Sequence, residues 1–182
     1  MEKRRLGLEA LASRGLTLRT QQPLVMPSAL ESNLVLEKLR EFAPEAVEDA
    51  REFRGELTIY IRPDRLIRVC EFLRDEPGLS FKYLSDITAV DFYPNEPRFE
   101  VVYHLLSLHS TERLRLKVRV SGENPRVDSL IPVYPSANAF EREVFDMFGI
   151  QFAGHPYLRR ILLPEDWEGY PLRKDYPTEG YR

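Results

Sequence analysis

Apolar residues alternate with polar ones along several segments of this chain, and this alternation is what most restricts its fold. Residues 56–61, 99–105 and 114–120 each carry an apolar side chain at every second position. This is the period of a β-strand with one buried face. Residues 84–93 favour a further strand. The short link at 107–111 predicts that the segments on either side of it form a hairpin.

Two segments in the first half have the spacing of amphipathic helices. Ser28 and Glu31 can form a capping box, and the helix that they open ends before Pro44. Pro63 suits the first turn of a second helix. An apolar stripe along that helix includes Cys70, which we interpret as a small core residue.

A third helix is predicted from about residue 139 to 148. Asn138 and Glu141 can form a capping box at its start, and Gly149 suits the left-handed residue after its end. Residues 127–134 form a short helix or turn in this interpretation. The order of elements predicts an α+β fold over residues 26–149, in which helices pack on one face of a mixed or antiparallel sheet of about four strands.

Residues 150–182 differ from the rest of the chain. They contain four closely spaced prolines, which exclude a long helix, yet they are rich in large apolar side chains. Such a segment is expected to be an extended, proline-rich arm that docks on a surface, either of its own domain or of a partner. Residues 1–25 are expected to be a tail that is disordered or bound to a partner.

Composition excludes or disfavours several classes of function and of binding site. The hydrophobic content of 43% and the charged content of 30% are typical of a globular protein, and the net charge of −3 disfavours a nucleic-acid partner. A single cysteine cannot form an intrachain disulfide or, by itself, a zinc or iron–sulfur site. No apolar run is long enough to predict a membrane span.

Three carboxylates in the third helix offer two interpretations. Glu141, Glu143 and Asp146 could serve acid–base chemistry or bind a metal, or they could have a structural or interface role. The spacing favours the second interpretation, because Glu141 and Glu143 point apart and Arg142 can pair with Asp146 four residues on.

Other charged residues have structural explanations. The stripe formed by Arg113, Arg115, Lys117 and Arg119 lies on one strand face, where acidic neighbours would pair with it. No two of the three histidines have the spacing of metal ligands on a helix. His155 lies in a loop, where it could bond the backbone or contact a partner.

One segment resembles a known family. The residues that carry the likeness are Glu141, Arg142, Glu143, Asp146, Met147 and Phe148, then His155 and residues 159–162, and finally the run Asp-Trp-Glu-Gly-Tyr-Pro-Leu-Arg-Lys-Asp-Tyr-Pro at 166–177. These resemble the 30-kDa subunit of respiratory complex I, which is the C subunit of bacterial NADH–quinone oxidoreductase. The likeness is looser upstream, from about residue 80.

The resemblance implies a protein of the peripheral arm, on the cytoplasmic face of the bacterial membrane, that carries no cofactor or catalytic residue of its own. Its expected partners are the 49-kDa-type D subunit and the quinone-site B subunit, which together form the quinone-reducing site. FMN, iron–sulfur clusters, NADH and quinone belong to the whole complex. We expect the form of the protein that is not fused to the 49-kDa-type partner.

The partner interface is expected to use charged and aromatic residues of the last third. They are Glu141, Arg142, Glu143, Asp146, His155, Arg159, Arg160, Trp167, Arg173, Lys174, Asp175 and Tyr176. Two alternatives stay open. One is the equivalent subunit of a membrane-bound hydrogenase, an F420- or ferredoxin-linked dehydrogenase or a photosynthetic NDH complex. The other is an independent enzyme that uses the three helical carboxylates.

Overall fold

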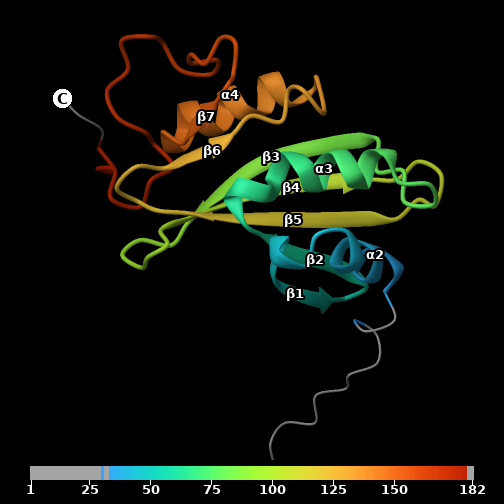
Figure 1. Cartoon of the computed structure of the whole chain (residues 1–182). Helices are drawn as coiled ribbons and strands as arrows, with labels where there is room; N and C mark the ends of the chain where they lie inside the picture. The colour runs from blue at the N-terminus through green and yellow to red at the C-terminus, as the bar shows by residue number, and fades with distance from the viewer. Residues whose placement is uncertain (1–29, 31–32, 180–182) are drawn as a thin grey trace, which may run out of the picture.

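A five-stranded mixed sheet organises the chain, which we describe from a computed structural model over residues 30 and 33–179 (Figure 1). The strands lie in the order β1-β2-β5-β4-β3, and β2 pairs with β5 in parallel while the other neighbours are antiparallel. Their bounds are Val47–Phe53 (β1), Glu56–Ile61 (β2), Tyr83–Asp91 (β3), Phe99–Leu106 (β4) and Arg113–Val120 (β5). The predicted hairpin is confirmed as the antiparallel pair β4–β5.

Helices cover one face of this sheet, as the α+β prediction required. The helices are α2 (Leu34–Phe42), α3 (Leu66–Asp75) and α4 (Ala137–Phe148), with short 3₁₀ turns at Pro44–Ala46 and Pro63–Arg65. Apolar side chains from α2, α3, α4 and the inner faces of β2, β3, β4 and β5 share one core. Cys70 is fully buried there, and burial raises the pKa of its thiol.

The opposite face of the sheet carries charged side chains, which form ion pairs with one another. Arg115 contacts Glu56 at 2.5 Å and Lys117 contacts Glu100 at 2.7 Å. Arg119 lies 3.5 Å from Glu48. Three of the four basic residues of the predicted stripe are therefore paired with acids of β1, β2 and β4.

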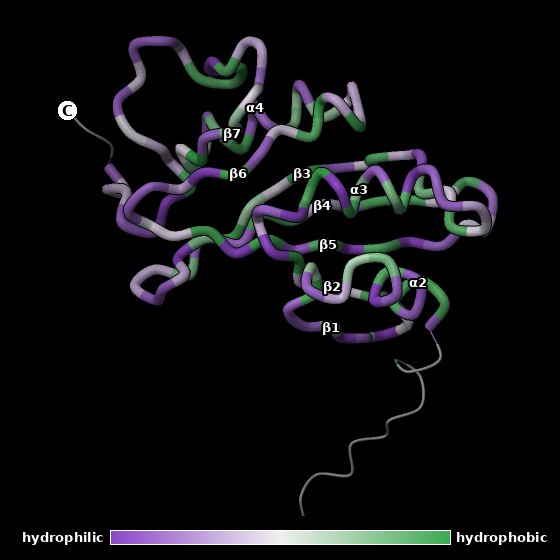
Figure 2. The backbone as a smooth tube through the Cα atoms, viewed as in Figure 1, coloured by the Kyte–Doolittle hydropathy of each residue, from purple (hydrophilic) through white to green (hydrophobic). Residues whose placement is uncertain are grey.

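Two local predictions were wrong or incomplete. β1 was not predicted, because this edge strand has few apolar residues and is mostly hydrophilic along its length (Figure 2). A helix or turn was predicted at residues 127–134, but Val127 and Asp128 belong to strand β6 (Arg126–Asp128), which pairs in parallel with β7 (Gln151–Ala153). The chain thus has a second, two-stranded sheet.

The helix caps also differ from the prediction. Ser136 precedes α4 without a side-chain hydrogen bond to its backbone, so Asn138 and Glu141 form no capping box. Asn33 caps α2, and its side-chain oxygen accepts hydrogen bonds from Val35 N and Leu36 N. The capping box expected at residues 28 and 31, and the tail at 1–25, lie outside the described residues.

Residues 154–179 contain no helix or strand. They leave β7, pass beside α4 and return to the end of the sheet where β3 ends and β4 begins (Figure 1). We call residues 154–179 the C-terminal arm. No helix among the described residues is long and apolar enough to cross a membrane.

Candidate partner-docking site

The chain turns sharply at the end of α4, before it enters β7 and then the C-terminal arm. Gly149 adopts a φ of 73°, and a side chain there would place its first carbon 2.5 Å from the ring of Tyr170. Glycine therefore serves two purposes, because it accepts the left-handed conformation and lets an aromatic ring of the arm lie on the helix end. The ring of Tyr170 also meets that of Phe145 edge-on at 6.2 Å.

Asp146 is the main anchor of the first half of the arm. Its side chain is completely buried. One oxygen accepts hydrogen bonds from three successive backbone N–H groups, Ile161 at 3.0 Å, Leu162 at 2.8 Å and Leu163 at 2.9 Å. The other oxygen accepts one from Arg160 at 2.6 Å.

These bonds decide the charge state of Asp146. Burial by itself would raise its pKa, but the three backbone donors and the Arg160 guanidinium outweigh burial and lower the pKa. The Asp146 carboxylate is therefore a fixed anion to which the backbone of the arm at residues 161–163 is hydrogen-bonded.

Arg160 closes the neck of a loop. Its guanidinium reaches the Asp146 carboxylate on one side, and it donates to the carbonyl oxygens of Trp167 and Gly169, both at 2.9 Å, on the other. The segment 161–169 therefore begins next to Arg160 and ends at a carbonyl that is hydrogen-bonded to the Arg160 guanidinium. We call residues 161–169 the neck loop.

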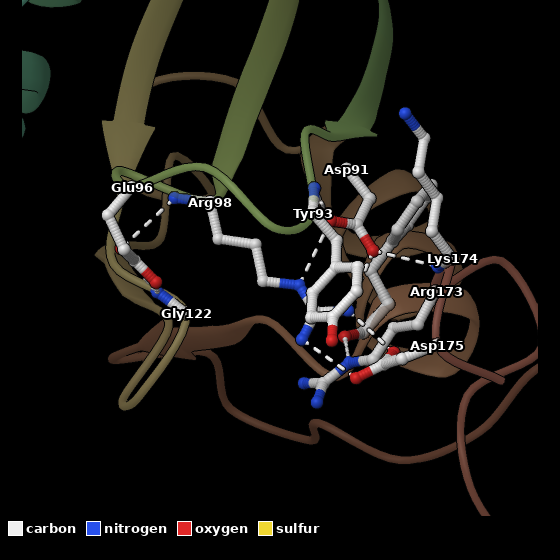
Figure 3. A network of polar contacts seen from close by, with 9 residues as sticks. Asp91, Tyr93, Glu96, Arg98, Gly122, Arg173, Lys174 and Asp175 are labelled. Carbon is white, nitrogen blue, oxygen red and sulfur yellow. Dashed lines mark hydrogen bonds and ion pairs between the residues drawn. The ribbon is translucent and has the colours of Figure 1, made fainter.

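A second anchor holds the end of the arm against the sheet (Figure 3). Arg98 donates two hydrogen bonds to Asp91, at 2.9 and 2.8 Å, and two to Asp175, at 3.0 and 2.6 Å. Asp91 also accepts hydrogen bonds from the backbone N–H groups of Lys174 and Tyr93. One guanidinium therefore joins β3, β4 and the arm.

The carboxylates at this anchor are ionised. Burial would raise the pKa of Asp91, yet its hydrogen bonds from Arg98, Lys174 and Tyr93 lower the pKa to about 2. The hydrogen bonds from Arg98 also lower the pKa of Asp175. Arg98 and Asp91 are 8% and 4% exposed, so this ion pair is largely shielded from water.

Arg173 contacts the same region without an acidic hydrogen-bond partner. It donates to the carbonyl oxygen of Phe148 at 2.6 Å and lies over the rings of Phe99 and Tyr170. Burial and the nearby Arg98 lower its pKa. The carbonyl at the end of α4 is a favourable place for this cation.

Glu141 faces the interior of the domain. Its side chain is fully buried, and it accepts hydrogen bonds from the Ser129 hydroxyl and from Leu130 N, both at 2.6 Å. Burial raises its pKa to about 7 despite these two bonds, and no ion-pair partner for it exists among the described residues. Glu141 ties the chain after β6 to α4.

Two further candidates, Arg142 and His155, bond the backbone of the chain. Arg142 donates to the carbonyl oxygens of Arg159 and Arg160 at 3.1 and 2.9 Å, so its predicted pair with Asp146 does not form. Asp146 is occupied by Arg160 instead. His155 lies 3.2 Å from the carbonyl oxygen of Asn138 and accepts from Tyr157 N.

The remaining candidates have exposed side chains or lie on the arm surface. Glu143, Arg159, Trp167 and Lys174 are exposed, and Tyr176 is partly buried. Arg159 lies 4.0 Å over the ring of Tyr157 and contacts Glu165 at 3.3 Å.

The three helical carboxylates do not converge on one point. Glu141 faces the core, Asp146 faces the arm and Glu143 is exposed. Across the part of the chain that the structure describes, no group of three or more acidic, histidine or cysteine side chains is placed to hold a metal ion. The arrangement does not support the interpretation as a carboxylate-dependent enzyme.

Sequence reasoning missed Asp91 and Arg98. A signal for Asp91 was present, because its position continues the apolar phase of β3 after Ile87 and Ala89. A charge on the buried side of a strand requires a partner. Arg98, just before β4, carries no such signal.

The chain is therefore a small α+β protein in which ion pairs hold a C-terminal arm on the domain, while outer side chains of that arm are exposed.

Comparisons with known proteins identify the family. The sequence model described as respiratory-chain NADH dehydrogenase, 30 Kd subunit, matches residues 59–182. The C subunit of NADH-quinone oxidoreductase from Roseiflexus sp. (strain RS-1) is 55% identical over 149 residues, which are 82% of this chain and 86% of the relative. The protein of that name from Cereibacter sphaeroides (strain ATCC 17029 / ATH 2.4.9) is 48% identical over 156 residues, which are 86% of this chain and 76% of the relative. This chain belongs to the family of the 30 Kd subunit of respiratory-chain NADH dehydrogenase.

Solved structures agree with the fold. A trypsin-resistant fragment (1-134) of Nqo5 matches with a TM-score of 0.57 and 32% identity, over 69% of this chain and all of the fragment. A chain of the membrane-bound sulfane sulfur reductase, an archaeal respiratory membrane complex, matches with a TM-score of 0.67 and 26% identity, over 79% of this chain and 84% of that one. The predicted family and the predicted α+β fold with a mixed sheet are confirmed.

Proposed function

We propose that this chain is a structural component of the peripheral arm of a proton-translocating NADH–quinone oxidoreductase. It lies on the cytoplasmic face of the bacterial membrane and supports the quinone-reducing module that the 49-kDa-type D subunit and the B subunit form. Membership of the 30 Kd family, with relatives that carry the name of the C subunit and match over most of their length, is the observation that carries this proposal. The chain itself performs no electron transfer; FMN, iron–sulfur clusters, NADH and quinone bind elsewhere in the complex.

The use of charge in the last third supports a mechanical role. The Asp146 carboxylate accepts hydrogen bonds from Arg160 and from three backbone N–H groups of the arm. Asp91 accepts one from Lys174 N of the arm, besides those from Arg98 and Tyr93 N. Buried carboxylates bonded in this way hold the arm in a fixed shape on the domain. We therefore propose that the arm is the part of residues 150–182 that docks on partner subunits, and that these aspartates act by positioning it.

The direct contacts in this proposal are the exposed side chains. They include Glu143, Arg159, Trp167, Lys174 and the partly buried Tyr176. Glu141, Asp146, Arg160 and Asp175 would contribute indirectly, because each already has a partner within the chain.

A second candidate is the equivalent component of a related membrane-bound complex. The observation that favours it is the similarity to a chain of the archaeal sulfane sulfur reductase complex. The two candidates predict the same fold but different companion subunits.

Purification of the tagged full-length chain from its native membranes tests the proposal. Mass spectrometry should identify the two quinone-site subunits together with an NADH-binding flavoprotein. Recovery of a different set of catalytic subunits would favour the second candidate. Recovery of the chain without any respiratory subunit would refute both.

A further inference from the structure

The neck loop, residues 161–169, is held firmly at its base but offers its outer side chains to solvent. Three of its backbone N–H groups bind Asp146, and Arg160 joins its two ends. The side chains of Ile161, Leu162 and Trp167 are nevertheless 42%, 60% and 41% exposed. Leu172, just beyond the loop, is 54% exposed. A small domain rarely exposes so many large apolar side chains within a dozen residues unless they contact something else.

Three acidic residues share the loop with these apolar ones. Glu165, Asp166 and Glu168 all lie on the loop and are exposed. Glu165 pairs with Arg159, whereas Asp166 and Glu168 have no ion-pair partner in the described part of the chain. The guanidinium of Arg160, at the neck of the loop, is already bonded to Asp146 and to two backbone carbonyls. The exposed side chains of the loop are therefore apolar and acidic, and we call Glu165, Asp166 and Glu168 its acidic border.

We propose that the neck loop is a preformed plug that inserts Leu162 and Trp167 into an apolar depression on a neighbouring subunit whose rim is basic. This inference rests on the proposed function, that the chain is part of a respiratory complex, and it specifies the chemistry of the contact. Charge complementarity specifies a basic rim, because docking would remove water from Asp166 and Glu168 and cations opposite them would replace it. Large aromatic and aliphatic side chains are the usual anchors of such contacts.

Fixing the loop before binding is what makes the anchors effective. A flexible segment loses conformational entropy when it docks, whereas a loop whose backbone is already bonded to Asp146 loses less. The same acidic border disfavours a lipid surface, since bacterial membranes with anionic headgroups repel carboxylates. The occupant is therefore a protein surface.

The test uses the full-length tagged chain expressed in cells that lack the native copy. Leu162→Asp and Trp167→Ala should each weaken binding of the neighbouring subunits by roughly 30-fold, the size expected for loss of a central anchor. Asp166→Lys combined with Glu168→Lys should reduce recovery most strongly at low salt. Leu108→Asp and Glu52→Lys are matched controls, because Leu108 is 69% exposed in the β4–β5 link and Glu52 is exposed on β1, both away from the arm. These controls should recover partners as the unmodified chain does.

The possible outcomes distinguish a failure of the plug from a failure of the proposed function. If the unmodified chain recovers respiratory subunits and the loop variants recover them equally well, the plug is refuted and the proposed function stands. If the unmodified chain recovers none, the proposed function itself fails. Binding of the unmodified chain to phosphatidylglycerol vesicles that is lost in Leu162→Asp would assign the loop to lipid and also refute the plug. Thermal unfolding of each variant confirms that its fold is retained.

Discussion

Substitution of Glu141 by glutamine should change how the stability of the domain depends on pH. Glu141 is buried, and burial raises its pKa from 4.5 to about 7. The folded state therefore binds a proton more tightly than the unfolded state does. The contribution of Glu141 is fully present below pH 4.5 and is lost as the pH rises through 7.

The size of the effect follows from the two pKa values. A rise from 4.5 to about 7 corresponds to about 3 kcal/mol of free energy of unfolding, lost between those two pH values. Glutamine resembles the protonated acid, because it can still accept from Leu130 N and it carries no charge. We expect Glu141→Gln to abolish this part of the pH dependence and to be the more stable protein above neutral pH.

Chemical denaturation at a series of pH values measures the difference between the two proteins. Subtracting their free energies of unfolding cancels the carboxylates that they share, including Asp91 and Asp146, which act in the opposite direction. Glu143→Gln is the matched control, because Glu143 lies on the same helix but is exposed. A pH-independent difference between Glu141→Gln and the unmodified chain would refute the reasoning.

Three other substitutions test the anchors. Arg98→Met should cost about 3–5 kcal/mol of unfolding free energy in denaturation experiments, because it leaves buried Asp91 without its cation. Asp146→Asn should increase hydrogen exchange at the amides of residues 161–163, whereas Asp166→Asn, at an exposed position, should leave this exchange unchanged. Equal exchange in the two variants would contradict the hydrogen bonds from these amides to Asp146. Gly149→Ala should lower the melting temperature more than Gly154→Ala, since both positions have positive φ but only Gly149 abuts Tyr170; equal losses would show that this contact is unimportant.

The sheet and helices were largely predictable because local patterns encode them. The alternation in β4 and β5 and the stripe on α3 each reflect one buried face, which any fold with these elements must respect. β1 escaped prediction because an edge strand beside a solvated face needs few apolar residues. Its register is set by pairing with β2, which is information that its own sequence does not contain.

The anchors were predictable only in part. The acids and arginines of the last third were recognised as important, but their partners depend on the path of an arm without regular structure. Arg142 has ideal helical spacing to Asp146, yet Arg160 is bonded there, and its backbone neighbours supply three further donors. Asp91 and Asp175 meet across 84 residues of chain through Arg98, which no local pattern indicates.

Hydrogen exchange of the isolated full-length chain tests most directly whether the arm is fixed before it meets a partner. We expect the amides of Ile161, Leu162, Leu163 and Lys174, which donate to Asp146 and Asp91, to be protected in the free protein. The neighbouring amides of Glu165 and Asp166 should exchange quickly. Exchange of all six at the rate of an unfolded chain would show that the arm is not fixed in advance and takes its shape only on a partner.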